Sequence, residues 1–138
     1  MSYWTYCRPG LLLGKDKIYI MEIKNVVLPI VTDQFESTVA FYKTITGKEV
    51  YLSAAHDGYK LCGIDKFVVL GAVAGPEALE IPRMVQAIFI VDEVKGYWEL
   101  LKDNCRKVIV PYSTVSTGTR FIIEQQDGKI IEYLQLND

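Results

Sequence analysis

From residue 21 onward, the apolar and polar positions follow the same order twice. Each half begins with a short strand-like run rich in Val and Ile, 23–31 in the first half and 85–91 in the second. Each run is followed by an aspartate, Asp33 or Asp92, and then by apolar residues at helical spacing. β-branched runs of this length are typical of buried strands. The sequence therefore predicts two copies of one unit.

One helix is predicted in each half. Asp33 with Glu36 three residues later indicates a helix start of the capping-box kind, and Gly47 indicates its end. The apolar stripes are Phe35, Val39, Tyr42 and Ile45 in the first half, and Val94, Tyr97, Trp98 and Leu101 in the second. Because Tyr42, Tyr97 and Trp98 lie on these stripes, we expect them to be core residues rather than ligand contacts.

Three further strand-like runs follow each helix. They are 48–52, 59–62 and 67–70 in the first half, and 107–110, 120–124 and 129–134 in the second. Turns are predicted at 63–66 and 125–128, where Asp127-Gly128 is a turn signal. An offset of 59 residues relates Asp33 to Asp92 and carries Tyr42 onto Leu101, so the register holds through the helix.

These patterns predict an α+β domain of two βαβββ modules, 21–74 and 84–138, joined by a Gly- and Pro-containing linker at 75–83. Two such modules can curl their strands into a cupped, barrel-like mixed sheet with the helices outside. The inside of the cup is then the expected ligand cavity. Residues 1–20 are interpreted as an N-terminal extension or a cloning remnant, with a lengthening of the first strand by 17–20 as the alternative.

Composition restricts the function. The 138 residues carry a net charge of −2, and no basic cluster predicts a nucleic-acid partner. No apolar run approaches the length needed to span a membrane. The three cysteines are odd in number and lack CxxC spacing, which argues against a zinc site or a disulfide framework. A reducing compartment follows, and we expect a cytoplasmic protein.

Four segments carry a resemblance to a known family. They are 27–30, 38–42, 87–92 and the closing 127–133, which reads Asp-Gly-Lys-Ile-Ile-Glu-Tyr. Their order resembles the vicinal oxygen chelate superfamily, which includes glyoxalase I, bleomycin-resistance proteins and extradiol dioxygenases. The resemblance covers roughly 21–138. It implies the cupped fold and, for the bleomycin-resistance group, a homodimer.

The resemblance also implies a divalent metal held by the first and last strands of each module. In this sequence the first-strand positions fall at Asn25 or Val27 and at Gln86. The first module ends near 69–71 without a carboxylate, and only Glu132 keeps the expected residue type. One carboxylate with two amides is too small a ligand set for a catalytic metal. We therefore expect no metal and no other cofactor, with a divalent metal as the alternative.

Glu132 is the first candidate site residue. Strand alternation puts it on one face with Ile130 and Leu134, the face that lines the cup by the resemblance. It is interpreted either as a ligand anchor or as the ion-pair partner of Arg120, and an unpaired buried Glu132 would act as an acid or base. His56, the one histidine, is expected in a loop.

The other candidate ligand-binding residues are amides and aromatic side chains on or near strands. They are Asn25, Gln86, Tyr51, Tyr59, Tyr112 and Phe121, in addition to Arg120. For Asn25 and Gln86 the alternative is a hydrogen bond to neighbouring backbone.

Three functions remain open. The leading hypothesis is a metal-independent protein of the bleomycin-resistance type that binds a small organic molecule and sequesters a drug or metabolite. The second is a glyoxalase-like lyase or isomerase with Glu132 as base, with or without a metal. The third is an accessory domain whose cup is packed core.

Overall fold

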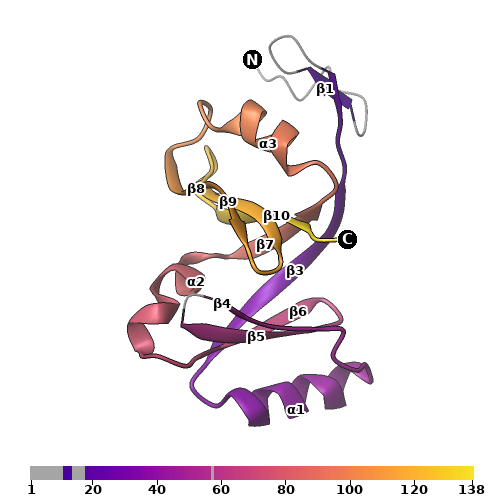
Figure 1. Cartoon of the computed structure of the whole chain (residues 1–138), viewed down its shortest axis with the longest axis vertical. Coiled ribbons are helices and arrows are strands. Elements are labelled where there is room, and N and C mark those ends of the chain that lie inside the picture. Colours follow the sequence, from indigo (N-terminus) through magenta and orange to yellow (C-terminus); the bar gives the residue numbers. More distant parts are fainter. Residues whose placement is uncertain (1–10, 14–17, 57) are drawn as a thin grey trace.

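The computed structural model describes residues 11–13, 18–56 and 58–138 (Figure 1). The first module comprises β3 (Ile23–Thr32), α1 (Phe35–Thr46), β4 (Leu52–His56), β5 (Tyr59–Ile64) and β6 (Phe67–Ala72). The second comprises β7 (Ala87–Val91), α3 (Val94–Leu101), β8 (Lys107–Val115), β9 (Gly118–Glu124) and β10 (Ile130–Leu136). The predicted element order, strand–helix–three strands in each half, is confirmed.

One mixed sheet of eight strands contains both modules, in the order β4-β5-β6-β3-β7-β10-β9-β8. Within each module the first strand runs parallel to the last, β3 beside β6 and β7 beside β10. The modules join where β3 pairs antiparallel with β7. The predicted α+β class with a cupped mixed sheet is therefore confirmed, and the two modules pair within one chain.

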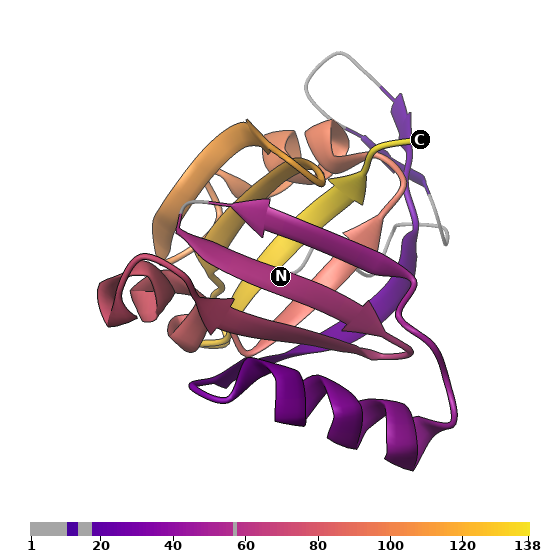
Figure 2. The same ribbon diagram turned by 60° about the horizontal axis from the view of Figure 1, so that its bottom comes forward.

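The sheet curls until its two ends meet, as Figure 2 shows with β4 and β5 in front of the strands of the second module. The hydroxyl of Ser116, in the β8–β9 turn, donates a hydrogen bond to the carbonyl oxygen of Ala55 on β4 at 3.2 Å. Arg120 of β9 and His56 of β4 make a second contact at 3.3 Å. These two contacts join β4, one end of the sheet order, to β9 and to the β8–β9 turn near the other end.

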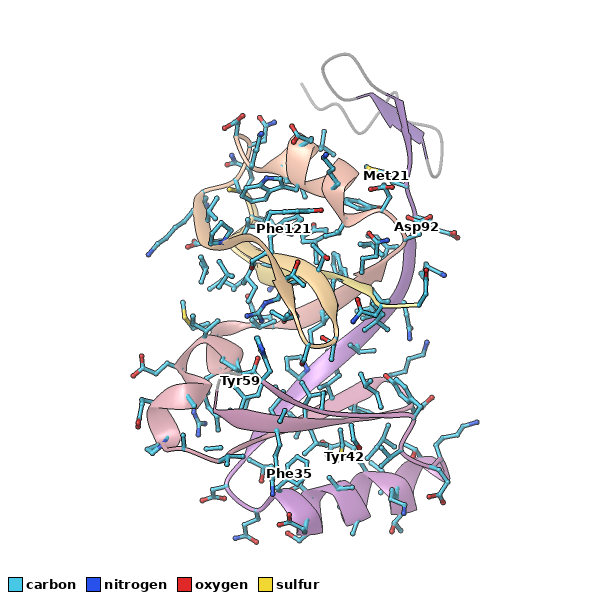
Figure 3. The ribbon with its side chains drawn as sticks, in the orientation of Figure 1. Met21, Phe35, Tyr42, Tyr59, Asp92 and Phe121 are labelled. Atoms are coloured by element: carbon cyan, nitrogen blue, oxygen red, sulfur yellow. The ribbon has the colours of Figure 1, made fainter. Side chains whose placement is uncertain are left out.

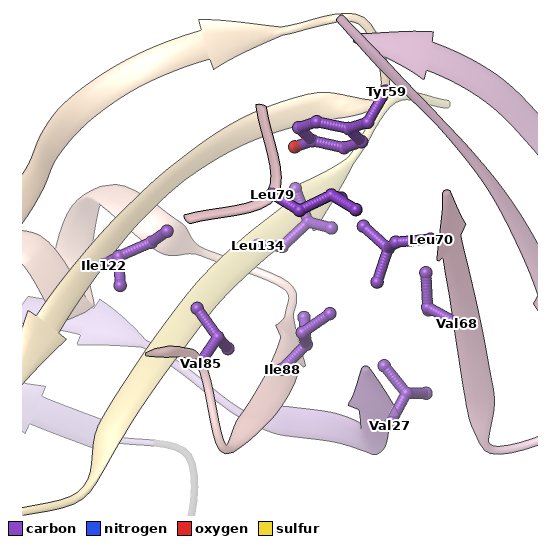
Figure 4. Close-up of a cluster of buried hydrophobic side chains, with 9 residues drawn as sticks. All are labelled: Val27, Tyr59, Val68, Leu70, Leu79, Val85, Ile88, Ile122 and Leu134. Atoms are coloured by element: carbon purple, nitrogen blue, oxygen red, sulfur yellow. The ribbon is translucent and has the colours of Figure 1, made fainter. Parts of the chain in front are cut away.

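The linker between the modules is helical. A 3-10 turn, η2 (Pro76–Leu79), leads into the short helix α2 (Glu80–Met84). Leu79 is 2% exposed and belongs to the cluster of buried side chains inside the cup, beside Tyr59 and Leu134 (Figure 4). The predicted linker therefore covers one end of the cup and contributes to its core.

Helix α1 starts differently from the prediction. No side chain caps its first turn, and the residue at the cap position is Gln34. The hydroxyl of Thr32 accepts the backbone N–H of Gln34 at 2.9 Å, while Glu36 reaches across to Lys60 at 3.0 Å. The predicted capping box is thus wrong, because Glu36 has a cationic partner on β5. Gly47 ends the helix in the left-handed conformation at φ 68°, as predicted.

The outer face of the sheet carries a second core beneath α3, with Phe121 at its centre (Figure 3). The Phe121 ring stacks on Tyr133 at 4.8 Å between ring centres and lies 5.1 Å from Trp98. Under α1, Tyr42 packs on Phe67 at 4.6 Å. The helical-stripe aromatics therefore pack against the outside of the sheet, as expected.

Two segments differ from the strands predicted for them. The predicted strand 48–52 lies four residues later, at Leu52–His56, so His56 ends a strand and the prediction of a loop is wrong. Ahead of that strand, the backbone N–H of Tyr51 donates a hydrogen bond to the carbonyl oxygen of Gly63 at 3.0 Å, and its ring packs against the same residue. Near the N-terminus, β2 (Ile18–Ile20) pairs with β1 (Leu11–Leu13) in a separate two-stranded sheet and does not lengthen β3.

Candidate functional site

The inside of the cup contains a cavity of about 470 Å³ lined by both modules. Its apolar wall includes Val27, Leu61, Val68, Leu70, Ile88 and Leu134. Its polar lining includes Asn25, Tyr51, His56, Tyr59, Arg120 and Glu132, with Lys48, Glu49 and Asp65 as further charged residues. A volume of this size is within the range of small-molecule sites.

Arg120 and Glu132 lie together on the cavity face. In the β9–β10 ladder Arg120 is opposite Leu134, and Glu132 is two residues away on the same face. The Arg120 Nη1 and Glu132 Oε2 atoms are 3.7 Å apart, and the two side chains are only 11% and 13% exposed. This confirms one of the two interpretations of Glu132, an ion pair with Arg120 on the neighbouring strand.

The separation of 3.7 Å is longer than a hydrogen bond, so the pair is loosely held. Burial raises the pKa of the Glu132 carboxyl, and the attraction of the Arg120 guanidinium only partly opposes that rise. Within the described residues, the Nε–H of Arg120 is buried and has no acceptor. A buried donor left unpaired costs about 1–3 kcal/mol. Arg120 therefore has a hydrogen-bond donor that no described group satisfies.

His56 fixes the other end of the guanidinium. Its Nε2 atom lies 3.3 Å from Nη2 of Arg120. An arginine only donates, so Nε2 of His56 accepts and the imidazole carries its proton on Nδ1. The ring also packs edge-on against Tyr59, at 5.5 Å between ring centres. Sequence reasoning missed His56 because its strand begins later than the residue pattern predicts.

The structure brings five of the candidate residues to the cavity: Asn25, Tyr51, Tyr59, Arg120 and Glu132. The other three, Gln86, Tyr112 and Phe121, do not line it. Phe121 follows Arg120 on one strand, and successive side chains point to opposite faces. It is fully buried in the outer core, so its assignment to the site is corrected.

Gln86 and Tyr112 are corrected for different reasons. The side-chain oxygen of Gln86 accepts the backbone N–H of Ile130 at 2.9 Å, which is the alternative considered for it. Tyr112 is 40% exposed and lies 6.3 Å from Trp98, between ring centres, on the helix side of the sheet. Irregular pairing of β8 with β9 between Val110 and Ser113 shifts the alternation at this point.

The residues do not fit the divalent metal that the resemblance implies. Glu132 lies opposite Ile88 in the β10–β7 pairing, and Val68 lies opposite Pro29, 59 residues before Ile88, in the β6–β3 pairing. Val68 therefore occupies the first module's equivalent of Glu132, without a ligand atom. Among the described residues no three His, Cys, Asp or Glu side chains gather into a metal-binding group. The guanidinium of Arg120 beside Glu132 would also repel a metal cation.

Replacing Glu132 by Gln should change how stability depends on pH. A carboxyl whose pKa is raised on folding binds more protons in the native state, so stability falls as pH rises above the unfolded pKa. Glu132→Gln removes this titration and preserves the shape of the side chain. Urea unfolding between pH 4.5 and 8 is expected to show the variant gaining stability over the wild type as pH rises.

Glu36→Gln is the matched control, because the hydrogen bond from Lys60 lowers the pKa of that exposed carboxyl. The stability difference between this variant and the wild type should therefore change with pH in the opposite direction. A stability difference between Glu132→Gln and the wild type that stays constant over this pH range would contradict the raised pKa.

In the part of the chain that the structure describes, no helix combines the length and the apolar character needed to cross a membrane. This agrees with the absence of a long apolar run in the sequence.

Comparison with known proteins places the fold. No protein-family model matches the chain, and no curated protein matches it significantly. Among solved structures, an uncharacterised protein from Methanosarcina mazei is 24% identical, with a TM-score of 0.74 over 84% of this chain and 94% of that one.

Two further similar structures come from proteins with a named function or superfamily. Methylmalonyl-CoA epimerase from Mycobacterium tuberculosis is 12% identical, with a TM-score of 0.63 over 84% of this chain and 90% of that one. A glyoxalase/bleomycin resistance protein/dioxygenase superfamily member from Vibrio splendidus is 16% identical, with a TM-score of 0.53 over 80% and 97%. Identities this low establish shared architecture and not shared activity. The chain has the vicinal oxygen chelate fold.

Proposed function

We propose that this protein binds a small organic molecule inside the cup without a metal ion, in the manner of a bleomycin-resistance protein that sequesters its ligand. The observation that carries the proposal is the cavity of about 470 Å³, lined by apolar side chains from both modules and by the buried Arg120–Glu132 pair. A mostly apolar concave site with a few convergent polar groups is typical of small-molecule binding.

The donor set supports metal independence. The position of the first module that corresponds to Glu132 is Val68, and Gln86 is engaged by the backbone of Ile130. Glu132 itself faces an arginine. We further propose that the ligand is a drug or a metabolite, which the protein sequesters, and that the protein is cytoplasmic.

A homodimer is part of the same proposal. Helix α1 packs over β5 and β6, and α3 over β9 and β10, so the outer surface of β3 lies between them (Figure 1). On that strand Val26 and Leu28 are each 46% exposed, and on α1 Phe41 is 55% exposed. Apolar side chains exposed together are suited to an interface between two copies. Light scattering that gives the monomer mass at micromolar concentration would contradict this part.

The test of ligand binding uses Nile red, an uncharged dye that fluoresces in apolar surroundings. Leu61→Trp places a larger side chain at a half-buried position of the cavity wall. We expect the wild type to enhance the dye's fluorescence. With this variant, the enhancement should be at least fivefold smaller. The reason is that the indole ring fills space that the dye would occupy.

Ala40→Trp, on the exposed side of α1, is the matched control and should behave as the wild type. Equal fluorescence with both variants would place the dye on the outer surface and contradict the proposal. Circular dichroism and thermal unfolding confirm that both variants fold.

A second candidate function is proton transfer at carbon, with Glu132 as base. The specific observation is that burial raises the pKa of Glu132 beside the guanidinium of Arg120, which could stabilise an oxyanion. Exchange of an α-proton of an acyl thioester for deuterium in D₂O, dependent on Glu132, would favour this reading. Binding without exchange would favour sequestration.

A further inference from the structure

Arg120 has more hydrogen-bond donors than the described part of the protein uses. A guanidinium carries five N–H donors and no acceptor. One of them reaches Nε2 of His56 at 3.3 Å, and the Nη1 group faces Glu132 at 3.7 Å, beyond hydrogen-bond length. The Nε–H is buried without an acceptor. The donors of Arg120 are therefore not all satisfied by the described part of the protein, and the loosely held Nη1 group is the one that a ligand oxygen atom could take over from Glu132.

The surroundings hold this side chain in place. Arg120 comes from β9, His56 from the end of β4, and Glu132 from β10, so three strands from both modules converge on the guanidinium. The side chain is 11% exposed and lines the large cavity. A buried, positioned arginine is suited to planar anions such as carboxylates, which accept two parallel hydrogen bonds.

We propose that the guanidinium of Arg120 takes the place of a metal cation in this cup, and that the cavity binds small organic monocarboxylates through it. The carboxylate accepts hydrogen bonds from Arg120, and the hydrocarbon part of the ligand lies along the wall formed by Val68, Leu70 and Ile88. This inference rests on the proposed function, because it assumes that the cavity is a ligand site.

The charge beside Glu132 opposes a bound cation. Arg120 of β9 is the charged group paired with Glu132, while His56, Tyr59, Lys48, Glu49 and Asp65 line the same cavity. An ammonium ligand placed against Glu132 would meet the fixed positive charge of Arg120. A carboxylate ligand instead replaces Glu132 as the partner of Arg120, with Glu132 taking up a proton. Burial raises the pKa of Glu132 and so makes this protonation easier.

The test compares three probes that share an eight-carbon chain: octanoate, 1-octanol and octylamine. Isothermal titration of the wild-type protein at pH 6.5 is expected to give octanoate at least tenfold tighter binding than 1-octanol, with octylamine weakest. Octanoate and 1-octanol binding equally would overturn the role of Arg120 and leave the proposed ligand-binding function standing. Octylamine binding most tightly would likewise overturn it. If none of the three binds, both the inference and the proposed function are contradicted for apolar ligands.

Two variants separate the contributions. Arg120→Met keeps the length and apolar stem of the side chain and removes its charge. Octanoate should then bind at least tenfold more weakly, while 1-octanol changes less than twofold. Glu132→Gln mimics the protonated carboxyl and should bind octanoate at least threefold tighter than the wild type at pH 8.

In the wild type, octanoate affinity should fall between pH 6 and pH 8, and in Glu132→Gln it should stay constant. If Arg120→Met does not fold, the three-probe comparison and Glu132→Gln still decide the inference. Unchanged octanoate affinity in Glu132→Gln at pH 8 would contradict the proton uptake.

Discussion

Replacing Phe121 by Ala is expected to lower the free energy of unfolding by about 3–5 kcal/mol, the usual cost of truncating a buried aromatic side chain. Phe121 has no exposed surface. Its ring stacks on Tyr133 with an interplanar angle of 7° and also packs against Trp98, so the substitution leaves a cavity between β9 and α3. Urea unfolding followed by tryptophan fluorescence measures the change, because Trp98 lies in the same cluster.

Ile45→Ala is the matched control, since the Ile45 side chain is 55% exposed on α1. Its cost should stay within about 1 kcal/mol. Similar losses for the two variants would mean that the Phe121 stack is not the centre of the outer core.

Gly118→Ala is expected to cost about 2–3 kcal/mol, because an added methyl group has no room. A Cβ atom at Gly118 would overlap the backbone carbonyl oxygen of Gln135 on the adjacent strand. Backbone atoms cannot rotate aside as a side chain can, so β9 and β10 would have to separate. For a domain of this size, thermal unfolding should move down by roughly 3 °C per kcal/mol.

Gly47→Ala provides the comparison. Gly47 has φ +68° and nothing within 4 Å of its added Cβ, so only the backbone conformation penalises the change. The expected cost there is about 1 kcal/mol. A smaller loss at Gly118 than at Gly47 would show that the two strands adjust to the methyl group without separating.

The repeat made the fold predictable from the sequence. Two helices and the paired strands follow from the apolar periods, because the apolar side chains pack against the sheet, although Ile45 of the α1 stripe is 55% exposed. Strand ends were less predictable. The strand that ends at His56 starts after Tyr51, whose ring packs against Gly63 of β5, a contact between residues 12 positions apart. No local pattern contains that information.

Strand alternation predicts which candidate side chains face the cavity, and the candidates that were chosen without it include residues on the opposite face. Arg120 and Phe121 are neighbours on one strand, so both could not face the cavity. Alternation alone would have removed Phe121 from the candidates. Tyr112 could not have been removed in this way, because irregular pairing in β8 changes the alternation before that residue. The contact of His56 with Arg120 spans 64 positions and depends on how far the sheet curls.

We expect the closure of the cup to reduce pairing of the end strand β4 with another molecule. Strands β4 and β8 are the two ends of the sheet order, and an end strand with unpaired backbone groups is a template for pairing with another molecule. The hydrogen bond from Ser116 to Ala55 and the contact between Arg120 and His56 bring the β8–β9 turn over β4. The arginine that we assign to ligand recognition therefore also helps to shield β4, one end of the sheet.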